Sequence, residues 1–192
     1  MTDPFALAMR VADILDDHGI PYALGGSLAS SMFGEPRGTV DIDMAIRLEG
    51  HQLEDFVGSL EIEFYVPVAE AQRAVAAHTS FNLIDDSGLK VDLFVLGESL
   101  LDTLQLERRR RVIVRDNPPQ HLWVTAPAEQ ILRKLEWYRD GGHVSERQWR
   151  DVVGLLQAQH ASLDIAELTH TAASIGLTDL LAAALEAADA SP

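Results

Sequence analysis

Hydrophobic and polar positions follow two different periods along this chain, and the two periods predict its elements. Apolar residues that recur three and four positions apart indicate amphipathic helices, and short apolar runs between turn-forming residues indicate strands. On this basis, helices are expected over residues 4–18, 28–33, 51–60, 68–77, 127–140, 146–159, 163–174 and 178–188. Strands are expected over residues 21–24, 39–47, 62–66, 81–84 and 89–96.

The order of these elements indicates the fold class. Strands and helices are mixed in the first part of the chain, and the remainder is helical, which predicts an α+β fold with a mixed α/β sheet flanked by helices. We expect a catalytic domain over residues 1–118 and a helical C-terminal subdomain over residues 119–192. The expected linker is DNPPQHLWVTAP, residues 116–127, because it is rich in prolines and turn formers.

Composition narrows the class of protein. The chain has 47% hydrophobic and 23% charged residues, as an ordinary globular protein does. It has no cysteine, which excludes disulfides, thiolate metal sites and cysteine nucleophiles. The N-terminal segment carries Asp3 where a signal peptide would be basic, and no apolar run is long enough for a membrane span. A cytoplasmic protein without membrane contact is therefore expected.

The charge is strongly negative but unevenly distributed. A formal net charge of −15 opposes non-specific attraction to nucleic acid. Four arginines, residues 108–111, nevertheless follow one another, and Arg115 lies just beyond them. Such a run is most often a solvated face, and the alternative is a local surface for nucleic acid.

The segment VDID is unusual for a strand, because aspartate is depleted from strand interiors. Side chains alternate between the two faces of a strand, so Asp41 and Asp43 are expected to project to the same side. Two neighbouring carboxylates repel each other unless a cation lies between them, and Mg²⁺ prefers oxygen ligands. The alternative is the polar face of a half-exposed strand.

A third aspartate has a similar setting. Asp92 lies in LKVDLFV between Val91 and Leu93. If this strand lies beside the VDID strand, the three carboxylates converge, and such a group could hold the two metal ions used in phosphoryl or nucleotidyl transfer. The alternative for Asp92 is a merely exposed position.

The segment LGGS, upstream of the aspartates, has the composition of a phosphate-binding loop. Gly25 and Gly26 allow close approach of the backbone, and a helix that starts at Ser27 directs free N–H groups at an anion. Arg37 and Thr39 could donate further hydrogen bonds to phosphate. Together these residues fit a nucleoside triphosphate.

The combination of GGS, R-x-T-x-D-x-D and a distal strand aspartate resembles the nucleotidyltransferase superfamily typified by DNA polymerase beta, kanamycin nucleotidyltransferase and the minimal nucleotidyltransferases. The resemblance implies that Gly26 and Ser27 hold the triphosphate. It implies that Asp41 and Asp43 bind two Mg²⁺, with Mn²⁺ as an alternative, and that Asp92 binds one metal and activates the attacking hydroxyl. The expected activity is Mg²⁺-dependent transfer of a nucleoside monophosphate from an NTP to a hydroxyl acceptor.

A second resemblance involves the helical part. Lys134 in EQILRKLEWYR, followed by Asp151 in RQWRDVVGLL, is similar to the AbiEii-type nucleotidyltransferases, the toxins of toxin–antitoxin pairs. This resemblance implies that Lys134 contacts nucleotide phosphates, that Asp151 helps to complete the site, and that an antitoxin protein exists. Without it, Lys134 extends from an apolar face to water, and Asp151 pairs with Arg147 or Arg150.

The acceptor is left open between RNA, tRNA in particular, a protein and a cationic small molecule, and the negative charge favours the last two. Three other classes of function are considered: a glycosyltransferase that uses D-x-D, an inactive relative that binds nucleotide as a regulatory module, and a purely structural protein. Intact carboxylates argue against the inactive relative, and no nucleoside-sugar region supports the glycosyltransferase.

Overall fold

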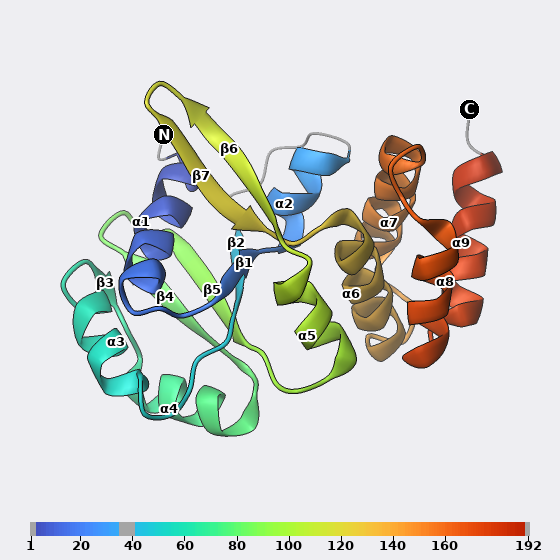
Figure 1. Ribbon diagram of the computed structural model, residues 1–192. Coiled ribbons are helices and arrows are strands. Elements are labelled where there is room, and N and C mark those ends of the chain that lie inside the picture. Colours follow the sequence, from blue (N-terminus) through green and yellow to red (C-terminus); the bar gives the residue numbers. More distant parts are fainter. Residues whose placement is uncertain (1–2, 35–40, 191–192) are drawn as a thin grey trace.

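The computed structural model describes residues 3–34 and 41–190. Its helices are α1 (Pro4–Asp17), α2 (Gly26–Phe33), α3 (Leu53–Leu60), α4 (Val68–Ala77), α5 (Leu100–Glu107), α6 (Pro127–Asp140), α7 (Glu146–Gln159), α8 (Ile165–Ser174) and α9 (Thr178–Ala190). Its strands are β1 (Tyr22–Leu24), β2 (Ile42–Ile46), β3 (Phe64–Tyr65), β4 (Ser80–Asp85), β5 (Lys90–Val95), β6 (Arg110–Asp116) and β7 (Pro119–Val124). The result is the predicted mixed sheet flanked by helices (Figure 1).

The strands form one sheet in the order β3-β4-β5-β2-β1-β7-β6. Strand β2 lies at its centre, parallel to β5 and antiparallel to β1. Strand β1 in turn runs parallel to β7, and the outer pairs β4–β5, β3–β4 and β6–β7 are antiparallel. The segment with two aspartates is therefore in the middle of the sheet, where neighbours on both sides fix its register.

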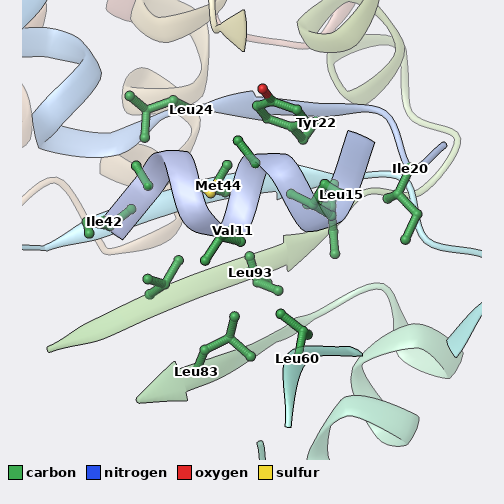
Figure 2. Close-up of a cluster of buried hydrophobic side chains, with 14 of the residues drawn as sticks. Val11, Leu15, Ile20, Tyr22, Leu24, Ile42, Met44, Leu60, Leu83 and Leu93 are labelled. Atoms are coloured by element: carbon green, nitrogen blue, oxygen red, sulfur yellow. The ribbon is translucent and has the colours of Figure 1, made fainter. Parts of the chain in front are cut away.

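One face of the sheet carries the main hydrophobic core. Helix α1 crosses this face and packs Val11 and Leu15 against Met44 of β2 and Leu93 of β5 (Figure 2). All four side chains are at most 1% exposed, and full burial of a side chain of this size is worth about 1.5–3 kcal/mol. Because side chains alternate along a strand, Asp43 and Asp92 are placed on the opposite face.

That opposite face meets the C-terminal helices. Helices α6 to α9 form a separate group beside the sheet, on the right of Figure 1, and enclose a second hydrophobic cluster with α5. Helices α2 and α5 connect the group to the sheet: α2 packs on β2, α6 and α7, and α5 packs on β1 and α6. Residues on α6 and α7 are thereby brought to the loop that precedes α2.

Several sequence predictions need correction. The segment predicted as a linker contains β7, which pairs with β1 and β6, so the sheet continues to Val124 and the helical part begins at Pro127. Helix α5 and strand β6 were not predicted. The strand expected over residues 62–66 is reduced to Phe64–Tyr65. Among the described residues, no helix has the length and apolar character needed to cross a lipid bilayer.

Candidate active site

The Gly-Gly-Ser segment forms the tight turn between β1 and α2. Gly25 N donates a hydrogen bond of 2.8 Å to Asp43 O, which fixes this turn to β2. Gly26 has φ +60°, a conformation that L-residues rarely adopt. A Cβ atom on Gly26 would lie 1.7 Å from Asp43 Oδ2, so only glycine leaves room for this carboxylate. Ser27 follows in the first turn of α2 and is 5% exposed.

Strand pairing brings two of the predicted aspartates together. Asp43 on β2 and Asp92 on β5 are direct register partners in a parallel pair, and neighbouring strands lie about 4.8 Å apart. Asn82 on β4 is in turn the register partner of Asp92, so an amide extends the row. The sequence analysis missed Asn82, whose only signal is its polar position between Phe81 and Leu83. Asp92 also forms an ion pair with Lys90, in which Asp92 Oδ1 lies 2.7 Å from Lys90 Nζ.

Asp41 has a different environment from Asp43. It precedes the first residue of β2, its side chain is 63% exposed, and its carboxylate lies 3.8 Å from Arg147 Nη2. Arg147, at the start of α7, also donates a hydrogen bond to Ser27 Oγ. Within residues 3–34 and 41–190, no group of three His, Cys, Asp or Glu side chains is placed to hold one metal ion. The remaining two predicted residues, Arg37 and Thr39, lie outside the described residues.

The two residues predicted on the helical part form a buried ion pair. Lys134 Nζ on α6 lies 2.8 Å from Asp151 Oδ2 on α7, and their side chains are 5% and 9% exposed. Gln148 Oε1 accepts a second hydrogen bond from Lys134 at 3.3 Å. Asp151, for which the alternative interpretation was an ion pair with Arg147 or Arg150, is paired with Lys134. Because Lys134 also lines the cavity that contains Asp43, the pair places positive charge beside the sheet carboxylates.

The electrostatics of the site centre on Asp43. Burial raises the pKa of the Asp43 carboxyl above its usual value, and the neighbouring carboxylates of Asp92 and Asp41 raise it further. The positive charges of Lys134 and Arg147 act in the opposite direction. A cation bound next to Asp43 would therefore stabilise the ionised form of its carboxyl group. The donor set of two adjacent carboxylates and an amide suits a hard cation such as Mg²⁺.

A cavity of about 360 Å³ adjoins Asp43. It lies between α5, α6 and the face of the sheet that carries Asp43. Phe94 and Trp137 line it and contact each other, with their ring centroids 5.7 Å apart. Arg133 on α6 is held at its rim by Asp102 and Gln105. Other lining residues include Gly25, Gly26, Ala45, His78, Thr125, Gln130 and Lys134.

The arginine run is distributed over three kinds of contact. Arg108 bridges Glu129 and Glu167, Arg109 stacks on the Trp123 ring with its Cζ atom 4.7 Å from the ring centroid, and Arg115 pairs with Asp3. Arg110 and Arg111 extend along β6, an edge strand of the sheet. Much of the positive charge of the run is therefore matched within the chain.

Comparison with known proteins supports the fold. No protein-family model and no curated protein matches the sequence. Among solved structures, an antigenic nucleotidyltransferase-like protein from Paracoccidioides brasiliensis is similar over 95% of this chain and 91% of its own, with a TM-score of 0.52 and 18% identity. The solution structure of the antibiotic-resistance factor ANT(2'')-Ia is similar over 96% and 94%, with a TM-score of 0.53 and 13% identity.

A third solved structure has a bound antibiotic. The lincosamide antibiotic adenylyltransferase LnuA, with lincomycin, is similar over 77% of this chain and 93% of its own, with a TM-score of 0.51 and 13% identity. The fold of this chain is therefore nucleotidyltransferase-like, as the GGS and D-x-D resemblance implies. The narrower AbiEii-type resemblance is not confirmed by these similarities.

We expect Gly26→Ala to destabilise the protein by about 2–3 kcal/mol, because alanine is strained at positive φ and its Cβ would displace the Asp43 side chain. Urea denaturation at neutral pH measures this change. Gly88→Ala is the matched control, since Gly88 has φ +82° and open space around it. It should show only the backbone part, about 1–2 kcal/mol. Equal effects of the two substitutions would contradict the contact with Asp43.

Proposed function

We propose that this protein is a Mg²⁺-dependent nucleotidyltransferase that transfers a nucleoside monophosphate from an NTP to a hydroxyl acceptor and releases pyrophosphate. The observation that carries the proposal is the contact of Gly26 with Asp43. It puts the N-terminal end of α2, a seat for phosphate oxygens, directly beside two carboxylates paired across β2 and β5. The nucleotidyltransferase-like fold supports the same conclusion.

The roles of the residues follow from their positions. Asp43 and Asp92, with Asp41, would hold the metal, which when bound supplies charge neutralisation for the phosphates. The backbone of Gly25 and Gly26 and the Ser27 hydroxyl would bind the triphosphate. In the reaction, the acceptor oxygen forms a bond to the α-phosphorus, and the bond from that phosphorus to the pyrophosphate oxygen breaks.

The proton and the remaining charges are handled by other side chains. Asp92, whose side chain is 26% exposed, would take the proton from the acceptor hydroxyl. Lys134 lies beside Asp43 and would offset the negative charge of the phosphates, with Asp151 holding its ammonium group in place. Arg37 and Thr39 remain proposed phosphate donors from the resemblance alone.

For the acceptor we propose a cationic small molecule. The net charge of −15 attracts cations, and the cavity beside Asp43 is within the size range of small-molecule sites. Two arginines of the run, Arg108 and Arg115, are paired with carboxylates of the chain, which reduces the charge that the run offers to RNA. Structures similar to this one include ANT(2'')-Ia with adenylyl-2''-tobramycin and LnuA with lincomycin. If the protein were instead an AbiEii-type nucleotidyltransferase, we would expect a protein or tRNA acceptor and an antitoxin partner.

The test is transfer of label from each α-³²P NTP, with Mg²⁺, to three separate acceptor pools: small molecules including aminoglycosides, total RNA and total protein. Pyrophosphate release is measured in parallel. Label in the small-molecule pool is expected, and it should be absent from the Asp41→Asn/Asp43→Asn variant. Label only in RNA or protein would reassign the acceptor, and the absence of both label and NTP binding would contradict the proposal.

A second candidate function is nucleotide binding without turnover. The pairing of Asp41 with Arg147 and of Asp92 with Lys90 favours it, because each ion pair competes with a metal ion for its carboxylate. Mg²⁺-dependent NTP binding without pyrophosphate release in any pool would support this function.

A further inference from the structure

Arg147 joins two parts of the candidate site and is itself far from both in sequence, 120 residues beyond Ser27. Its Nη2 atom donates to Ser27 Oγ at the start of α2 and lies 3.8 Å from Asp41 Oδ2, just before β2. Both the Arg147 and the Asp41 side chains are more than half exposed, at 55% and 63%. The guanidinium group therefore lies where the phosphate loop and the aspartate segment meet, with access to solvent.

The helix that carries Arg147 is fixed in place. Ser145 caps α7 by accepting from Gln148 N, and the buried Lys134–Asp151 pair ties the next turn of α7 to α6. Helix α2 packs on α7 as well. With its backbone held in this way, Arg147 can reach different partners near the Ser27 loop only by changing its side-chain rotamer.

The charges around Arg147 indicate what it would bind. Three carboxylates, Asp41, Asp43 and Asp92, surround the proposed phosphate site, so a triphosphate needs positive charge there besides the metal. Lys134 is buried in its pair with Asp151, whereas Arg147 lies at the surface. A guanidinium group has the planar fork of donors that matches phosphate oxygens.

We propose that Arg147 binds the triphosphate of the NTP and, in the protein without nucleotide, holds the Asp41 carboxylate. Arrival of the nucleotide moves Arg147 from Asp41 to phosphate, and the Asp41 carboxylate, which already lies close enough to Asp43 to raise the pKa of that carboxyl, loses this contact. The inference rests on the proposed function, since it assumes that the Ser27 loop receives a triphosphate.

The first experiment measures equilibrium binding by isothermal titration calorimetry. The NTP that binds most tightly to wild type, and the corresponding monophosphate, are titrated with Mg²⁺ into wild type, Arg147→Gln and Arg150→Gln. Arg150 is the matched control because it is an exposed arginine on the same helix. Loss of a charged hydrogen-bond donor predicts NTP affinity about 10- to 100-fold weaker in Arg147→Gln. Monophosphate affinity, and both affinities of Arg150→Gln, should change less than about 3-fold.

The second experiment tests the exchange with Asp41. In EDTA, Asp41→Asn should strengthen NTP binding, because it removes a negative charge and frees Arg147. Most of that gain should disappear in the Asp41→Asn/Arg147→Gln double variant. Asp92 pairs with Lys90 and serves as the control, because the gain from Asp92→Asn should be the same with and without Arg147→Gln.

The outcomes separate the two proposals. If wild type binds no NTP, the proposed function fails and this inference fails with it. If wild type binds NTP and Arg147→Gln binds it equally well, or loses NTP and monophosphate affinity alike, only the inference about Arg147 is wrong. A gain from Asp41→Asn that is the same with and without Arg147→Gln would overturn the exchange.

Discussion

Replacing Lys134 by methionine is expected to lower the free energy of unfolding by about 3–5 kcal/mol, because it leaves the Asp151 carboxylate buried without its cation. The pair joins α6 to α7 at side-chain exposures of 5% and 9%. Urea denaturation at pH 7 measures the change.

Two further variants test this explanation. Lys134→Met/Asp151→Leu removes both charges and should recover most of the lost stability, since a buried ion pair can be replaced by apolar side chains of similar volume. Lys90→Met breaks the exposed pair with Asp92, in which Lys90 is 53% exposed, and should cost no more than about 1 kcal/mol. If Lys134→Met and Lys90→Met lowered the free energy of unfolding by similar amounts, burial of the Lys134–Asp151 pair would not explain the effect.

Asp43→Asn is expected to reduce the rate of nucleotidyl transfer about 1,000-fold, because an amide is a much weaker metal ligand than a carboxylate and several kcal/mol of charge stabilisation is lost. The side chain is replaced by one of nearly equal size, so the fold and the Gly26 contact should be kept. The measurement is kcat for label transfer with saturating Mg²⁺. Asp86→Asn, at an exposed aspartate in the β4–β5 turn, should retain full activity.

The same substitution should have the opposite effect on stability when no metal is present. Burial and the charges of Asp92 and Asp41 raise the pKa of Asp43 in the folded protein, so its ionised form is less favourable there than in the unfolded chain. The stability contributed by this carboxyl is thus present below the unfolded pKa of about 3.9 and is lost as pH rises through the higher folded pKa.

It follows that Asp43→Asn should be more stable than wild type at neutral pH in EDTA, with a difference that shrinks toward acid pH. Thermal unfolding between pH 4 and pH 8 measures this difference. Mg²⁺ should raise the melting temperature of wild type and not that of the variant. A variant less stable than wild type in EDTA, or stabilised equally by Mg²⁺, would show that Asp43 is not a site of carboxylate repulsion relieved by metal.

The elements of the fold were largely predictable from local pattern. Helices α4, α6 and α7 have the predicted bounds, because apolar spacing and caps such as Ser145 are properties of neighbouring residues. Helix α5 and strand β6 were missed beside the arginine run, and the proline-rich segment proved to contain β7. A strand is stabilised by partners far along the chain, and the residues of β7 do not reveal those partners.

The candidate site was predictable only in part. The sequence indicated that Asp43 and Asp92 lie on strands. The two carboxylates could converge only if those strands were neighbours, and in the structure β5 does pair with β2. The sequence also indicated that Asp41 and Asp43 project to the same side. In the structure Asp41 directly precedes β2, its charge raises the pKa of the Asp43 carboxyl, and its own carboxylate lies 3.8 Å from Arg147 Nη2.

Three features of this protein could be recognised in its amino-acid sequence: a glycine that can adopt positive φ, aspartates in apolar strands, and the amphipathic helices. They follow from short-range sterics and periodicity, which depend on residues a few positions apart. Which polar groups meet is a property of the folded protein: Lys134 contacts Asp151, Arg147 contacts Ser27 and Asp41, and Arg108 of the arginine run contacts Glu129. These contacts depend on how α2, α6 and α7 pack against one another. Arg147 and Ser27, for example, are more than 100 residues apart in the chain.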